Sequence, residues 1–267
     1  MANPTFGLWG YTVDRGNVKA RGVVVDDATL EEVLTSKVRP LLQDEEGKES
    51  IRELLSELAS TGFMKENIER LLDDSDVSTP DWMVGEALAE AFVCDEHGCS
   101  FPWPTGRDLK NPEASPTGAD MVGFQKTDDT ALPYRFAFGE VKTSSEKNWP
   151  PQVAHCRTGL QQQIENLRDS TKVKGGLFRY LGHHAGGKSW SPMYISAATR
   201  YLSSEYNDVI LIGVLVRDVE PNKLDLKQRA INLSKDKHDL TDVAFYALYL
   251  SEDTIQKLPT LSGMMAA

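Results

Sequence analysis

The chain of 267 residues has few cysteines, no long apolar run and more acidic than basic side chains. Its three cysteines are an odd number, which argues against a disulfide framework and favours a reducing compartment. No stretch reaches the ~18 apolar residues that a membrane-spanning helix needs. The N-terminus, M-A-N-P-T-F-G, lacks the basic start and apolar centre of a secretory signal. We therefore expect a cytoplasmic protein with no membrane association.

Signatures of several enzyme classes are also missing. The sequence contains no glycine-rich phosphate loop, no internal repeat and no low-complexity run. A hydrolase of the Ser-His-Asp type is disfavoured because no G-x-S-x-G elbow occurs. A dedicated DNA-reading domain is disfavoured as well, since no basic helix-turn-helix pattern is found.

Positive charge is scarce overall but unevenly distributed. The net charge is −11, and residues 1–106 carry 9 basic and 21 acidic side chains. Residues 107–190, in contrast, carry 12 basic and 9 acidic side chains. A polyanion would be drawn to this middle segment and repelled by the N-terminal third. An acidic protein that acts on nucleic acid would also gain from a basic partner that supplies part of the affinity.

Residues 118–142 contain two apolar runs joined by a turn. The first run, M-V-G-F, follows Asp120, and the second, Y-R-F-A-F-G-E-V-K, ends with Glu140 and Lys142. The segment between them is rich in Asp, Thr and Pro, which predicts an antiparallel hairpin. Because side chains alternate along a strand, Glu140 and Lys142 share one face. If pairing brings Asp120 to that face, two carboxylates beside an ammonium make an oxygen-ligand site that suits Mg²⁺.

The acid-x-Lys tripeptide at the end of this hairpin has little meaning without its context. Only the copy at 140–142 ends an apolar run, follows a strand that begins at an Asp and precedes a polar helix. An exposed hairpin whose charges only solvate one face is the alternative interpretation. The four copies are Glu46-Gly47-Lys48, Asp108-Leu109-Lys110, Glu140-Val141-Lys142 and Asp225-Leu226-Lys227.

Asp120 followed by Glu140-Val141-Lys142 resembles the active-site signature of the PD-(D/E)xK nuclease superfamily, over roughly residues 85–167. Ala119 replaces the proline of the first motif, and that proline carries no chemistry. The resemblance implies a restriction-endonuclease-like core and a nuclease that binds Mg²⁺ or Mn²⁺ through Asp120 and Glu140. Lys142 would then assist a water that attacks the phosphate in line, with no covalent intermediate.

The same resemblance implies further site residues on the neighbouring helices. The helix before the hairpin often supplies a carboxylate to the metal, a role that Glu86 matches better than Glu90. A glutamine on the helix after the hairpin often supports the lysine or the phosphate. Gln161, Gln162 and Gln163 are candidates, and Gln161 and Gln163 flank the predicted buried face most closely. A solvated helix face is the alternative for each of these residues.

More narrowly, the layout is similar to that of nuclease subunits of Hachiman anti-phage defence systems. The shared features are an acidic helical N-terminal region, G-A-D-M-V-G-F, F-G-E-V-K-T-S-S and two late apolar strands. This resemblance implies DNA as the substrate and a helicase or ATPase as a protein partner. A catalytically inactive nucleic-acid-binding module with the same fold, and a subunit of a restriction system, are the alternatives.

Basic residues outside the hairpin are candidates for contacts with nucleic acid. Arg107 and Lys110 lie in a proline-rich loop next to Trp103, which we expect to be a core anchor rather than a base-stacking residue. A later stretch interleaves cations with aromatic residues, and its cations are candidates for phosphate contacts. These later candidates are Lys172, Lys174, Arg179 and Lys188.

A cluster of cysteine and histidine invites a zinc interpretation. Structural zinc needs four ligands, usually in two pairs, and His155 and Cys156 could supply a second pair beside Cys94, His97 and Cys99. The spacing is not that of a standard zinc motif, and free cysteines are often buried without any metal. We therefore expect buried thiols rather than a zinc site.

The order of predicted elements is that of an α/β protein. A soft boundary near residue 78 separates an acidic, mostly helical N-terminal region, 1–78, that could dock a partner, from a nuclease-like domain, 79–267. That domain would hold a mixed sheet flanked by helices. We expect a hairpin at 6–25 and buried strands at 208–216 and 243–250, and a mobile polar loop at 143–151. Helices are predicted at 27–42, 49–60, 65–72, 81–93, 152–167, 172–188, 192–202 and 224–233.

Overall fold

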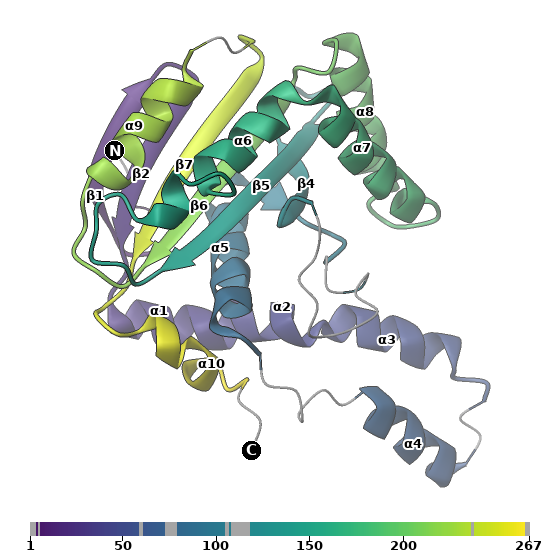
Figure 1. Ribbon diagram of the computed structural model, residues 1–267. Coiled ribbons are helices and arrows are strands. Elements are labelled where there is room, and N and C mark those ends of the chain that lie inside the picture. Colours follow the sequence, from purple (N-terminus) through teal and green to yellow (C-terminus); the bar gives the residue numbers. More distant parts are fainter. Residues whose placement is uncertain are drawn as a thin grey trace.

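A single seven-stranded mixed sheet forms the centre of the protein (Figure 1). The computed structural model describes residues 4, 6–58, 61–72, 79–104, 107, 118–235 and 238–264. The strand order is β1-β2-β7-β6-β5-β4-β3, with β2, β7, β6 and β5 parallel and the outer pairs antiparallel. The strands are β1 Leu8–Arg15, β2 Val18–Val24, β3 Cys99–Ser100, β4 Met121–Lys126, β5 Tyr134–Ser144, β6 Val209–Arg217 and β7 Thr241–Tyr249.

The apolar strand predicted at 208–216 lies in the middle of the sheet. All nine residues of β6 are buried, and β6 pairs in parallel with β5 on one side and β7 on the other. A strand covered on both faces needs apolar residues at every position, which is why its sequence does not alternate. The chain is therefore an α/β protein with a mixed sheet flanked by helices, as its element order predicts.

Helices cover both faces of the sheet. One face packs against α6 Leu160–Asp169, α7 Thr171–Ala185, α8 Ser191–Ser203 and α9 Leu224–Leu233. The other packs against α1 Asp27–Val33, the π-helix Leu34–Val38, α2 Arg39–Gln43, α5 Asp81–His97, a 3-10 turn Ile255–Lys257 and α10 Leu258–Leu261. Among the described residues no helix has the length and apolar character needed to cross a bilayer.

The N-terminal hairpin belongs to the same sheet as the rest of the chain. β2 pairs in parallel with β7, with Val18 opposite Val243 and Val24 opposite Tyr249. The predicted boundary near residue 78 therefore does not separate two sheets. The helix predicted at 27–42 is divided by a π-helical stretch, and its N-cap is Asp26, because the Asp26 carboxylate accepts the Thr29 N–H.

Two helices of the N-terminal region extend away from the sheet, at the lower right of Figure 1. They are α3 Glu45–Leu54 and α4 Gly62–Leu72, each shifted by a few residues from the predicted ranges 49–60 and 65–72. Asp44 caps the start of α3 by accepting the Gly47 N–H. Neither helix contains a buried residue.

Candidate functional site

The hairpin β4–β5 brings the three residues of the sequence motif to one face. Met121 lies opposite Gly139, so Asp120, one residue earlier, lies next to Glu140 across the hairpin. Phe136 and Phe138 belong to the core under α6–α8, and alternation along β5 places Glu140 and Lys142 on that same side. The hairpin and its register are therefore those that the motif requires.

Asp120 directly precedes β4, at the point where β5 continues beyond its pairing with that strand. Glu140–Ser144 pair with β6 only, among the residues that the structure describes. The Asp120 carboxylate takes the place of a strand partner here, because its Oδ2 accepts the Val141 N–H at 2.7 Å. Burial raises the pKa of Asp120 above its ordinary value, although this hydrogen bond opposes the shift. The remaining oxygen, Oδ1, has no hydrogen bond to a described residue, so one oxygen of this carboxylate is left for a ligand.

Glu140 and Lys142 form a close ion pair. The Lys142 Nζ lies 2.6 Å from Glu140 Oε1, and Glu140 is only 4% exposed. Burial and the charge of Asp120 together raise the pKa of Glu140 to about 7. Burial alone would lower the pKa of Lys142, but the hydrogen-bonded Glu140 carboxylate raises it overall, so this lysine is a cation. The Lys142 ammonium thus partly offsets the electrostatic repulsion between the buried carboxylates of Asp120 and Glu140.

Glu86 approaches this pair from the opposite helical layer. It lies in the first half of α5, next to Gly85. At Gly85 the helix packs closely against β5, because a Cβ there would lie 2.5 Å from the Thr143 Oγ1. Burial and then the charge of Asp120 raise the pKa of Glu86 to about 8. Glu90, one turn later, has a pKa of about 7 from burial alone. Of these two helix carboxylates, Glu86 is therefore the one whose pKa is shifted by the charge of Asp120.

The donor set fits a divalent cation in its chemistry. Asp120, Glu140 and Glu86 offer carboxylate oxygens, the ligands that Mg²⁺ and Mn²⁺ prefer. A cation, the Lys142 ammonium, already lies against Glu140 Oε1. Within the described residues, however, no three His, Cys, Asp or Glu side chains are gathered into a metal cluster by themselves. An ion would therefore have to draw these carboxylates closer together.

The glutamines of α6 do not share one role. Gln161 donates to Glu165 and accepts from Arg229 and Asn232 of α9. This corrects the expectation that Gln161 supports Lys142, because its side chain is held toward α9. Gln163 is half-buried on the other flank of the helix, and Gln162 is exposed. Gln163 is thus the remaining candidate on this helix.

Two of the predicted phosphate-binding cations are already engaged elsewhere. Lys174 is 4% exposed and donates to the Tyr206 carbonyl, so the prediction for Lys174 is wrong. The Arg107 guanidinium binds the Asp44 carboxylate in a bidentate manner, at 2.7 and 2.5 Å, and therefore serves the N-terminus of α3 rather than a phosphate. Bidentate pairing of this kind uses the donors that a phosphate would need.

The other predicted cations remain open to solvent. Lys172, Arg179 and Lys188 are exposed on or just after α7, on the same face of the sheet as the motif. Lys188 also lies over the ring of Trp103, 5.7 Å from its centroid. Trp103 stacks on the His184 ring with a centroid distance of 4.1 Å and packs against the core, in agreement with a structural role. Lys110 lies outside the described residues.

The cysteines and histidines considered for zinc do not come together as a metal site. All five are described, and no group among the described residues meets the requirement of three converging ligands. His97 instead hydrogen-bonds the Tyr246 hydroxyl at 2.7 Å. Burial raises the pKa of the Cys94 thiol to about 12 and that of Cys99 in the same direction. These thiols are protonated and buried, whereas zinc needs thiolates.

The segment after β5 is more firmly held than its polar sequence predicts. Thr143 and Ser144 still belong to β5, and the fully buried Arg217 donates to the carbonyls of Glu146 and Asn148. The Trp149 indole donates to the Glu220 carbonyl at 3.0 Å. Arg217 was not predicted from the sequence as a residue that holds this segment. A basic residue at the end of an otherwise apolar strand was the feature that could have indicated this role.

Comparison with protein-family models and with curated proteins finds no match to this chain. The interpretation of the site therefore depends on its geometry and on the resemblance of its motif.

Proposed function

We propose that this chain is a metal-dependent nuclease that hydrolyses phosphodiester bonds of DNA. The observation that carries the proposal is the placement of Asp120 beside the Glu140–Lys142 ion pair at the unpaired edge of β5. Glu86 lies close enough to Asp120 for the two charges to influence each other. Perturbed carboxylates around a lysine are what a phosphoryl-transfer site needs and what a structural surface rarely shows.

The residues divide into cation ligands and a residue that faces the phosphate. Asp120, Glu140 and Glu86 would hold Mg²⁺ or Mn²⁺. The bound ion would supply Lewis-acid stabilisation of the charge that develops on the phosphate. Lys142 would leave Glu140 when the ion binds, and its ammonium would then position the attacking water and stabilise a phosphate oxygen.

The order of elements around the site supports the same proposal. α5, β3, β4, β5, the helices α6–α8 and β6 follow one another in the chain, and the four strands are neighbours in the sheet. This helix–three strands–helix–strand order agrees with the restriction-endonuclease-like core that the motif's resemblance implies. The exposed cations of α7 lie on the same side of the sheet as the motif and would follow a DNA backbone.

A role in anti-phage defence, with a helicase or ATPase as partner, is part of the proposal and is supported by the sequence resemblance alone. Copurification of the chain with the product of a neighbouring gene would test it. The absence of a complex with any helicase or ATPase would count against this part without affecting the nuclease assignment.

Two substitutions at the ion pair test the activity. We expect Glu140→Gln and Lys142→Met each to lower Mg²⁺-dependent cleavage of DNA by roughly 10²–10⁴-fold, since each removes a charge from the reacting centre. The matched control is the exposed pair Lys147–Glu252, where Glu252→Gln and Lys147→Met should leave the rate unchanged. Cleavage that survives the Glu140→Gln/Lys142→Met double substitution would show that the site is assigned wrongly.

The ion pair itself favours one alternative, a nucleic-acid-binding module that does not cleave. A lysine held 2.6 Å from Glu140 satisfies that carboxylate without a metal. Calorimetry with Mg²⁺ and Mn²⁺ distinguishes the two functions. Heat of binding that disappears in Asp120→Asn supports the nuclease, and the absence of binding by the unmodified protein supports the module.

A further inference from the structure

The helices α3 and α4 carry the most exposed large apolar side chains of the described residues. Leu71 is 84%, Leu54 80% and Phe63 73% exposed. We call the surface formed by the exposed apolar residues of these two helices and of the turn that follows α3 the α3–α4 surface. Its members are Ile51, Leu54, Leu58, Phe63, Met64 and Leu71, each of which is exposed. Exposed apolar residues gathered on two neighbouring helices, which the Arg52–Glu69 ion pair joins, mark an interaction site more often than singly scattered ones.

The two helices have the pattern of packed helices but lack packing. Ile51 and Leu54 of α3, and Leu58 of the turn that follows it, recur at the spacing of one apolar helix face. Helices as short as α3 and α4, 10 and 11 residues, are marginal in water and gain their stability by burying such a face. No residue of either helix is buried, and both project away from the sheet (Figure 1). The exposed apolar face is therefore suited to burial against another molecule.

Polar contacts hold the helices in place without covering their apolar face. Arg52 of α3 binds Glu69 of α4, with Nε 3.0 Å from Oε1, and the N-terminal cap Asp44 binds Arg107. Exposed ion pairs of the first kind contribute little to stability. They set the position of the helices but leave the leucines in water.

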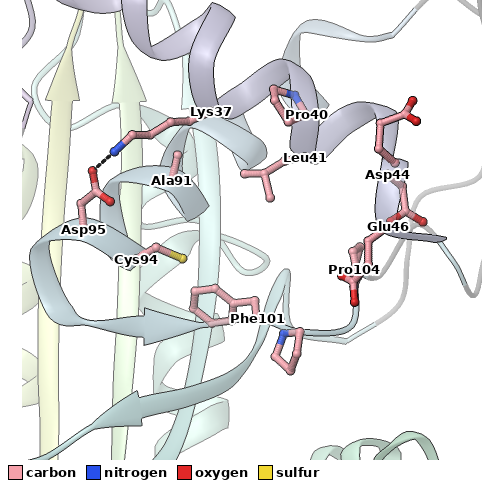
Figure 2. Close-up of a pocket in the computed structure, with 12 residues that line it drawn as sticks. Lys37, Pro40, Leu41, Asp44, Glu46, Ala91, Cys94, Asp95, Phe101 and Pro104 are labelled. Atoms are coloured by element: carbon pink, nitrogen blue, oxygen red, sulfur yellow. Dashed lines mark hydrogen bonds and ion pairs between the residues drawn. The ribbon is translucent and has the colours of Figure 1, made fainter. Parts of the chain in front are cut away.

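A pocket adjoins the start of α3, the helix that carries part of this surface. It has a volume of about 440 Å³ and lies between α2, the first turn of α3 and the C-terminal half of α5. Figure 2 shows the apolar side chains of Leu41, Ala91 and Phe101 on its walls, with Asp44 and Glu46 at one end. Asp44 and Glu46 already pair with Arg107, so the pocket fits an apolar side chain.

Charge decides which kind of molecule covers the surface. Residues 44–72 carry 8 acidic and 4 basic side chains, whereas residues 1–43 carry 5 of each. The net negative charge of residues 44–72 repels DNA, an anionic lipid surface and a second copy of the chain. We propose that the α3–α4 surface and the adjoining pocket dock a protein partner through a basic, amphipathic segment, with an apolar side chain of the partner in the pocket. The proposal is independent of the proposed nuclease activity.

Photocrosslinking of the full chain tests the partner and its chemistry. A benzoylphenylalanine is placed at Leu58 in one variant and, as the matched control, at Ile195 of α8, which is 63% exposed and far from this surface in the fold. After irradiation in the source cells, mass spectrometry identifies the crosslinked peptide. We expect the Leu58 variant to crosslink to a net-positive amphipathic segment of another protein and the Ile195 variant not to crosslink to it. A crosslink to a second copy, to nucleic acid or to lipid, or no crosslink at all, overturns the proposal.

A second variant separates docking from folding. Leu54→Ser/Phe63→Ser should lower the crosslink yield at Leu58 by about tenfold or more, because the anchoring side chains are lost. The thermal midpoint of the free protein should change by less than about 2 °C, since neither side chain is buried. An unchanged yield would also contradict the proposal.

Discussion

The Arg217→Met substitution tests how much the buried Arg217 side chain contributes to stability. This side chain forms an ion pair with Asp225 of α9 and also donates to carbonyls of the segment that follows Lys142. The side chains of Arg217 and Asp225 are both fully buried, with Nη1 3.3 Å from Oδ1. Removing one member of such a pair leaves a buried charge without its partner and costs about 3–5 kcal/mol. A domain of ordinary stability has about 5–15 kcal/mol in total, so the variant should fold but should be severely weakened.

Urea unfolding followed by circular dichroism measures this loss. Lys147→Met is the control, because its pair with Glu252 is 75% and 66% exposed, and a solvent-screened pair contributes little to stability. Arg217→Met/Asp225→Asn should recover a large part of the loss, since it removes the unpaired charge. Equal losses in Arg217→Met and Lys147→Met would refute the reasoning.

The pH dependence of the same variant gives a second check. Burial already raises the pKa of Asp225, and removal of the guanidinium would raise it further. A raised pKa in the folded state means that the folded protein binds the proton more readily than the unfolded one, so stability increases as the pH falls through that pKa. The loss caused by Arg217→Met should therefore be smaller at pH 5 than at pH 8. A larger loss at pH 5 would contradict an unpaired carboxylate as the cause.

Two further predictions concern the helix α5 and its neighbours. Gly85→Ala should destabilise by about 1–3 kcal/mol because its Cβ would lie 2.5 Å from the Thr143 Oγ1, whereas Gly176→Ala, which meets nothing within 4 Å in α7, should stabilise by up to about 1 kcal/mol. Thermal midpoints that move in the same direction would contradict this. Burial lowers the pKa of His97 to about 4, whereas an unfolded histidine has a pKa of about 6.5. The stability that this shift provides above pH 6.5 should therefore be lost as the pH falls toward 4, and the free energy of unfolding should decrease by about 2 kcal/mol between pH 7 and 5. In His97→Gln, which cannot be protonated and can still bond Tyr246, urea unfolding should show no such loss between these pH values, and an unchanged slope would reject the assignment.

The candidate site was predictable because its geometry is local. Asp120 and Glu140 belong to the two arms of one hairpin, and the turn and the alternation of apolar residues determine which side chains share a face. The buried strand β6 and the helix α5 were predictable for the same reason, since the relevant periodicity lies within ten to twenty consecutive residues.

The roles of the flanking cations and amides were not predictable in this way. Lys174 and Gln161 have ordinary helix-surface sequences, yet one is buried against the Tyr206 carbonyl and the other is held by α9. Their partners lie 32 and 68 residues away in the chain. Which side of a helix meets solvent depends on the neighbouring elements, and no periodicity within the helix specifies those neighbours.

The sequence by itself determined the hairpin, the pattern of charges on its one face, and the class of elements that surround it, because these follow from side-chain alternation, turn residues and apolar periodicity over short distances. Only the tertiary structure decided that the N-terminal hairpin extends the same sheet, that Glu86 reaches the motif from the opposite layer, and that α3 and α4 remain uncovered. These features depend on which distant surfaces meet in the folded chain, and burial against a distant partner leaves no local signature in the sequence.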